Sequence, residues 1–385
     1  MKRIIILLFA LVCIINTAMA NDCVFFVKGN QLIPDDTEKD ISVQKEILTI
    51  SLQDDGYTTV NVYYEFFNKL DTDKTVVMGF EANPPYNTDA EFSPKGIHPY
   101  IRSFAVKMND NEIQYKNAVV GLNASRALKP LDLKEWKASG EAYEESNGQM
   151  LTNGNLEMNY AYAYYFDATF KPGLNKIVHN YSYDTSNGVG QVFIVDYKLS
   201  PATRWANQQI DDFTLIVRAD KTAKHFMIKK ATLPNAEIKL LEGSGKNRVV
   251  KHYNDEYYEF TLRNGAFSLH ENNFKPDKEN ELNINSCENL YYTFDEAGDH
   301  MKVGCTYDRS RNFFYITNVL KTDFDVKVAH NLPYAHRGHV FKNKELKEYF
   351  ENLWWYMPDA KYVDSQEDFT ETDKEFLKKE KVKED

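Results

Sequence analysis

The sequence lacks a hydrophobic run long enough to cross a membrane. Residues 4–15 supply twelve apolar residues in a row, which is well short of the about 20 that a membrane-spanning helix needs. Lys2 and Arg3 precede this run, and Ala18-Met19-Ala20 follow it as small residues that signal peptidase accepts. We therefore expect residues 1–20 to be a cleaved secretory signal peptide. The mature protein would be exported, periplasmic or extracellular, and without a membrane span.

Cysteine is scarce as well, with four in the chain, of which Cys13 would leave with the signal peptide. The remaining Cys23, Cys287 and Cys305 are an odd number in a compartment that permits disulfides. Cys287 and Cys305 lie 18 positions apart on either side of a strand-like segment. This spacing predicts a disulfide across a hairpin, and it leaves Cys23 either as a free thiol or for an intermolecular bridge.

The motifs of common hydrolases are absent. Neither G-x-S-x-G nor H-E-x-x-H occurs, so we assign no catalytic residue and expect no cofactor. His330, His336 and His339 are close in sequence, but without a further Cys or carboxylate at ligand spacing they do not define a zinc site. We therefore expect no metal.

Positive charge is also in short supply. The chain has 46 Lys and Arg against 57 Asp and Glu, a formal charge of −11, and loss of Lys2 and Arg3 makes it 44 against 57, or −13. Such a protein repels nucleic acid and anionic lipid. Neither is an expected partner.

What the chain has in abundance is alternation of apolar and polar residues, the period of a half-buried strand. Residues 48–52 and 60–66 alternate on either side of Asp54-Asp55-Gly56, which predicts a β-hairpin. Many short strands with few helical stretches indicate a mainly β fold of antiparallel β-sandwiches. A break after residue 199 suggests a lobe over residues 21–200 and a second over 201–328. Further strands are expected at 75–80, 101–107, 159–170, 176–183, 190–199, 213–218, 236–241 and 257–262, and a short helix at 131–137.

The last sixty or so residues change to a helical pattern, which predicts a small α-helical domain over residues 329–385. Asn343 is a good N-cap, and Pro358 closes the segment. A second helix fits 373–381, with Thr370 as its cap and Asp373 three residues on. The apolar residues at helical spacing in the first helix are Leu346, Tyr349, Phe350, Leu353 and Trp354.

The segment Tyr334-Ala335-His336-Arg337-Gly338 and the aromatic spacing that follows it resemble the YARHG domain over roughly residues 326–385. His336 and Arg337 stand in the opposite order to the Arg-His of the family. The resemblance implies a small helical module of exported bacterial proteins, and the upstream part is similar to an exported β-rich domain that often precedes it. It supports the architecture and export and transfers no catalytic residue.

Aromatic rings stack on sugars and Arg pairs with carboxylates, and both groups occur in bacterial wall polymers. The alternative is that the aromatic residues form the core of a domain too small to spare them. Trp355 and Tyr356, which lie off the helical stripe, are the sharpest test of the two interpretations. The candidate binding residues are Tyr334, His336, Arg337, His339, Trp355 and Tyr356.

These observations favour an exported, non-catalytic protein of the cell envelope that contacts a wall glycan or another envelope protein through its C-terminal domain. An envelope hydrolase with a site of scattered carboxylates and histidines is the rival hypothesis. A carrier of a small ligand in a β-sandwich pocket is the third.

Overall fold

The structure is a computed structural model. The expected signal peptide, Cys23, the helix expected at 131–137, and Cys287 of the expected disulfide lie outside the residues that it describes. The described residues are 28–30, 33–34, 37–82, 95–121, 150–152, 155–157, 160–188, 191–252, 254–286, 305–308, 313–316, 322–365, 367 and 369–381.

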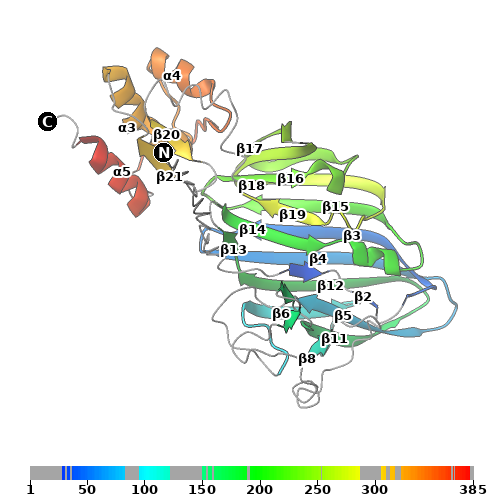
Figure 1. The fold of residues 1–385 in the computed structure, drawn as a ribbon. Coiled ribbons are helices and arrows are strands. Elements are labelled where there is room, and N and C mark those ends of the chain that lie inside the picture. Colours follow the sequence, from blue (N-terminus) through cyan, green and yellow to red (C-terminus); the bar gives the residue numbers. More distant parts are fainter. Residues whose placement is uncertain are drawn as a thin grey trace, which may run out of the picture.

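The described part of the chain is mainly β, with helices at its C-terminal end (Figure 1), so the predicted fold class is confirmed. Its largest element is a 13-stranded sheet in the order β1 (Lys28–Asn30), β14 (Gln191–Lys198), β19 (Leu282–Asn285), β16 (Lys224–Lys229), β18 (Asp255–Phe274), β15 (Ile210–Ala219), β3 (Ile41–Leu52), β4 (Tyr57–Asn68), β12 (Gly173–Asp184), β6 (Ile101–Met108) and β7 (Asn111–Glu112), with β13 (Ser186–Gly188) beside β14 and β17 (Glu237–His252) beside β18.

The remaining elements are smaller. A four-stranded sheet contains β2 (Ile33–Pro34), β5 (Lys74–Ala82), β11 (Tyr160–Phe170) and β8 (Lys116–Gly121). Two hairpins are β9 (Met150–Thr152) with β10 (Asn155–Glu157), and β20 (Cys305–Asp308) with β21 (Phe313–Ile316). The helices are η1 (Ser200–Arg204), η2 (Lys230–Thr232), α3 (Asp323–Arg337), α4 (Lys344–Glu351) and α5 (Glu371–Lys381).

The large sheet folds back on itself. Strands β14 and β4 belong to two different arms of the sheet, β16–β19–β14 and β15–β3–β4. The hydroxyl oxygens of Tyr64 on β4 and Tyr197 on β14 are nevertheless 3.3 Å apart, so the two arms face each other as layers. The fold occurs at the long strand β18, because β15 and β16 pair with successive halves of it while β17 runs along both halves. The two layers enclose a core packed ring on ring, such as Phe66 on Trp205 with centroids 4.6 Å apart.

Residue 200 does not divide this sheet into two sandwiches. Strand β15, which follows it, pairs in parallel with β3, from near the N-terminus. The connection through η1 makes this possible: Trp205 is 1% exposed in the core, and the Asn207 side chain exchanges two hydrogen bonds with the backbone of Val43 at 3.2 and 2.8 Å. Backbone hydrogen bonds between β15 and β3 thus join the two expected lobes in one sheet.

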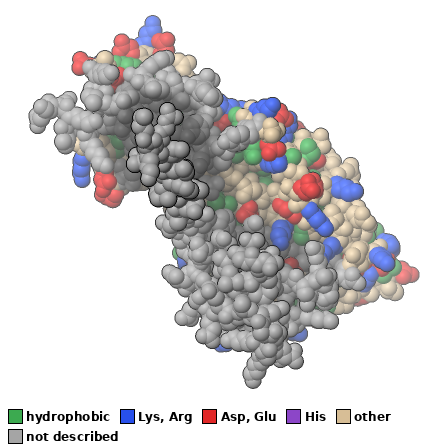
Figure 2. Space-filling view, in the orientation of Figure 1, with side chains coloured by type: hydrophobic (Ala, Val, Ile, Leu, Met, Phe, Trp, Pro, Cys, Tyr) green, Lys and Arg blue, Asp and Glu red, His purple; other side chains and the backbone are tan. Residues whose placement is uncertain are grey.

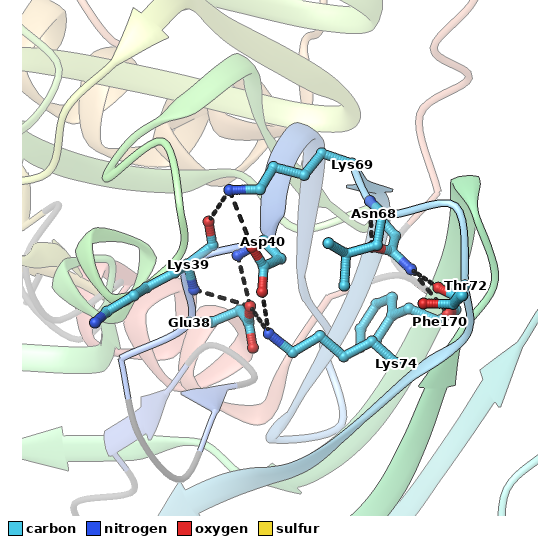
Figure 3. A network of polar contacts seen from close by, with 9 residues as sticks. Glu38, Lys39, Asp40, Asn68, Lys69, Thr72, Lys74 and Phe170 are labelled. Atoms are coloured by element: carbon cyan, nitrogen blue, oxygen red, sulfur yellow. Dashed lines mark hydrogen bonds and ion pairs between the residues drawn. The ribbon is translucent and has the colours of Figure 1, made fainter.

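A network of ion pairs holds the segment before β3 against the turn between β4 and β5 (Figure 3). Lys74 Nζ lies 2.6 Å from both Glu38 Oε1 and Asp40 Oδ2, and Lys69 Nζ lies 3.0 Å from Asp40 Oδ1. Hydrogen bonds from Lys74 and Lys69 hold the pKa of the Asp40 carboxyl below its usual value. The Asn68 amide nearby is 1% exposed and donates to two backbone carbonyls. The network ties these segments together.

Helices α3, α4 and α5 and the hairpin β20–β21 gather at the end of the sheet where β17 lies (Figure 1). We call α3 to α5 with their connections the helical module. It has its own core, in which apolar residues between 328 and 356, from α3, α4 and the following turn, pack with Phe376 of α5. The predicted helices at 346 and 373 are confirmed with their caps, since Asn343 Oδ1 accepts the Leu346 N–H at 3.1 Å and Thr370 Oγ1 accepts the Asp373 N–H at 3.2 Å.

Candidate functional site

The outer face of strands β16, β17 and β18 forms a polar surface against the helical module. Thr261 on β18 is paired with His225 on one side and Lys246 on the other, so their side chains lie on one face. The opposite face carries core residues such as Phe260. We call the polar face the platform; its residues are His225, Ser244, Lys246, Arg248, Glu259, Thr261 and Arg263.

Four platform side chains, His225, Glu259, Thr261 and Arg263, are buried, and the other three are half-buried. Glu259, 1% exposed, accepts Arg248 Nε at 2.5 Å. His225 Nδ1 lies 2.8 Å from Thr261 Oγ1. A buried polar face of this kind is stable only when its hydrogen bonds are made.

Helix α3 brings the Tyr334–Gly338 motif to this platform. Thr322 begins the helix with a capping box, in which Thr322 and Asp325 exchange hydrogen bonds. Gly338 ends it in the left-handed conformation with φ of 97°. The sequence prediction placed no helix here, although the Thr-x-x-Asp cap and the terminal glycine are helix signals, because Pro333 interrupts the pattern.

Arg263 of the platform joins the module to the sheet. It is 6% exposed, and it donates Nη1 to the His336 carbonyl at 2.9 Å and Nη2 to the Met357 carbonyl at 2.8 Å. Gly338 allows this approach, since a Cβ at that position would lie 2.5 Å from Arg263 Nη2. The glycine of the motif is therefore required both by the backbone conformation and by the guanidinium above it.

Two further platform side chains contact the turn that follows α4. Lys246 Nζ donates to the Tyr356 carbonyl at 2.7 Å. The Arg248 guanidinium lies 4.3 Å from the centroid of the Trp354 ring, a cation–π contact. Burial lowers the pKa of Lys246 and of Arg263.

A cavity of about 820 Å³ opens beside these contacts, between the sheet and the module. The sheet contributes Asp54, Lys221 and Arg263 among its lining, and the module contributes Arg337 and Lys361. The volume is within the range of about 300 to 1,000 Å³ of ligand pockets. We call this cavity the interface pocket.

His336 faces the interface pocket and the platform at once. It is 8% exposed, and its ring centroid is 6.2 Å from that of His225. Burial, together with the charges of Arg337, Arg263 and Lys224, holds the pKa of His336 well below its usual value. The imidazole is neutral at pH 7 and adds no charge to the pocket.

Arg337 and Tyr334 connect α3 to the segment around α5. Arg337 Nη2 lies 2.5 Å from Asp373 Oδ2, and its guanidinium lies 4.4 Å from the centroid of the Phe369 ring. Tyr334 packs edge-on against the same Phe369 ring at 4.9 Å. The neighbouring His339 pairs with Asp364 at 2.7 Å, away from the pocket lining.

Trp355 and Tyr356 are each 2% exposed and lie in the core of the module. Helix α4 ends at Glu351, earlier than the spacing of the aromatic residues predicts, so the helical stripe does not apply to the turn after it. In this arrangement neither ring offers a face to a ligand. Of the six candidate residues, the structure brings His336 and Arg337 to the interface pocket.

The sheet side of the pocket was not predicted from the sequence. Arg263 lies within a strand, and Lys221 in the turn between β15 and β16; Lys361, on the module side, lies in the segment after α4. Single basic residues of this kind carry no local signal. Only the docking of the module gathers them.

Other site types find no support in the described residues. No group of three or more His, Cys, Asp or Glu side chains is arranged there to hold a metal ion. Among the described helices, none is long and apolar enough to cross a membrane.

The C-terminal region of the chain is similar to a known domain family. Residues 309–384 match the YARHG domain, which confirms the predicted resemblance and extends it upstream to include β21. YARHG domains are typical of exported proteins. None of the curated proteins matches the chain.

Several solved structures are similar to parts of this chain. A Legionella pneumophila protein described as a candidate nutrient-binding protein is 18% identical, with 93% of this chain and 99% of that chain covered and a TM-score of 0.46. An M1 zinc metallopeptidase from Deinococcus radiodurans is 11% identical, with 61% and 43% covered and a TM-score of 0.22. Baculovirus P35 is 12% identical, with 64% and 96% covered and a TM-score of 0.26. TM-scores below 0.5 support no inference about function.

Proposed function

We propose that this protein is an exported, non-catalytic binding protein of the bacterial cell envelope, and that its ligand occupies the interface pocket. The ligand would be a segment of wall glycan or of an envelope protein. The YARHG match and the expected signal peptide support export.

The interface pocket is the observation that carries this proposal. Both the sheet and the module line it, and each contributes charged side chains that reach a common volume of about 820 Å³. A ligand that touches both parts stabilises their association, because binding to the docked state shifts the equilibrium toward it. The module would thus complete the site as well as cover the platform.

Co-sedimentation of the mature protein, residues 21–385, with purified peptidoglycan sacculi tests the proposal. The pocket variant K221A/K361A removes an exposed lysine from each side of the pocket. The control variant K278A/K342A removes two exposed lysines outside the pocket lining and matches the change in charge. We expect the mature protein and the control variant to pellet, and the pocket variant to pellet several-fold less.

Equal pelleting of both variants would place wall binding outside the pocket. If the mature protein itself stays in the supernatant, the wall glycan is not the ligand. Cross-linking from a cysteine introduced at position 361, in intact cells, would then search for the envelope protein.

A further inference from the structure

The interface pocket has an excess of positive charge after its ion pairs are accounted for. Asp54 pairs with Lys224 at 2.9 Å, and Asp373 pairs with Arg337 at 2.5 Å. The remaining charged lining residues are Lys221, Arg263 and Lys361 against Asp359. Among the described residues, neither Lys221 nor Lys361 has an ion-pair partner.

The Arg263 guanidinium is an unusual source of this excess. Its two hydrogen bonds go to backbone carbonyls rather than to a carboxylate. Asp359 is close enough to act on Arg263 electrostatically, but its Oδ1 accepts the backbone N–H of Lys361 at 2.9 Å. A buried charge without a directly bonded counter-ion favours an anion in the adjacent space.

The excess is local, because the chain as a whole has a formal charge of −11. Basic and acidic side chains are interspersed over the coloured surface in Figure 2. Basic and acidic groups also form ion pairs, such as Lys45 with Asp212 at 2.6 Å. A cationic pocket in an acidic protein attracts a small anion against the overall field.

The rest of the lining is suited to a ligand rich in hydroxyl groups. Hydroxyl and amide side chains come from both the sheet and the module, and Ala223 is the aliphatic side chain beside them. Hydroxyl and amide groups can both donate hydrogen bonds to hydroxyls and accept hydrogen bonds from them. The polar members are Thr222, Ser244, Asn264, Tyr362 and Thr370.

We infer that the interface pocket recognises an acidic saccharide, whose anionic group lies against Lys221, Arg263 and Lys361 while its hydroxyl groups contact the polar lining. This inference rests on the proposed function and names the ligand class of the same site. The anionic group can be a carboxylate, as in a muramic acid residue, or a phosphate ester. Lys221 belongs to the sheet and Lys361 to the module, so both parts contribute positive charge to the same pocket.

Three sugars with a common ring test the inference by calorimetric titration into the mature protein. N-acetylmuramic acid carries a carboxylate, N-acetylglucosamine 6-phosphate carries a phosphate, and N-acetylglucosamine is neutral. We expect at least one of the two acids to bind at least tenfold more tightly than the neutral sugar, and the preferred acid to identify the anionic group. Binding should weaken as salt is raised, since charged contacts are screened.

The variants locate the binding. We expect K221A/K361A to bind the preferred acid at least tenfold more weakly and K278A/K342A to bind it as the mature protein does. Equal affinity for the neutral sugar, no binding of either acid, or an unchanged affinity in the pocket variant would each overturn the inference.

The outcomes also separate this inference from the proposed function. If sacculi bind through the pocket but neither acid does, the ligand class is wrong and the binding function stands. If an acid binds in the pocket while sacculi do not pellet the protein, the wall ligand is wrong and the acidic-saccharide site stands.

Discussion

Replacement of His179 by phenylalanine should remove a large part of the acid sensitivity of the fold. His179 lies on β12 with no exposed surface, and the Tyr64 and Tyr181 rings are stacked near it at 5.9 and 6.0 Å. Among the described residues, neither of its ring nitrogens has a hydrogen-bond partner. Burial alone lowers the pKa of His179 to about 3.

The direction of the effect follows from this pKa. The folded protein keeps His179 neutral, whereas an unfolded chain binds a proton there below its ordinary pKa of about 6.5. The contribution of His179 to the free energy of unfolding is therefore fully present above pH 6.5. It is lost as the pH falls toward 3, by about 1.4 kcal/mol for each pH unit. Between pH 7.5 and pH 5 the loss from this one residue is about 2 kcal/mol, because the folded-state pKa is still far below pH 5.

Urea unfolding of the mature protein and of H179F at pH 7.5 and pH 5 measures this difference. Phenylalanine keeps an aromatic ring between Tyr64 and Tyr181 and has no titratable group. His336 and other groups titrate in both proteins, so their contributions cancel when the two free energies of unfolding are subtracted. We expect the free energy of unfolding of H179F, minus that of the mature protein, to be about 2 kcal/mol larger at pH 5 than at pH 7.5. A difference that is the same at both pH values would refute the reasoning.

Three further substitutions test how the module is docked and how the core is packed. G338A should destabilise the protein by more than G173A in urea unfolding. Both glycines have a positive φ, so alanine costs about 1 kcal/mol at either position, but of the two only the Cβ at 338 would meet a side chain. Equal losses would mean that Arg263 accommodates the methyl group. R263M leaves the carbonyls of His336 and Met357 without their donor, so we expect the docked state to lose about 3 kcal/mol of stability. Trypsin should then release the module faster, and unchanged digestion would contradict this. W205A should lower the free energy of unfolding by about 3 to 5 kcal/mol, and a loss below 1 kcal/mol would show that the core collapses onto the space.

Local patterns predicted much of the secondary structure. The hairpin across Asp54-Asp55-Gly56 and the caps at Asn343 and Thr370 all occur where the sequence places them. Alternation and capping are properties of a few consecutive residues, which is why they can be recognised without the fold. Strand β16 and helix α3 were missed, the latter because Pro333 obscured the pattern of an otherwise capped helix.

The aromatic residues after α4 show the limit of such patterns. The sequence sets Trp355 and Tyr356 off the helical stripe, and this holds only while the chain remains helical. The chain turns after Glu351, and both side chains then point into the module core.

The sequence by itself determined the fold class, the resemblance of the C-terminal region to the YARHG domain, and the expectation of export. Only the tertiary structure joined β3 to β15 across the expected lobe boundary and placed Arg263 against His336, 73 residues away. The physical reason is that strand periodicity and helix capping depend on neighbours along the chain. The interface pocket depends on which surfaces pack together, and this is decided by the packing of the module against the platform.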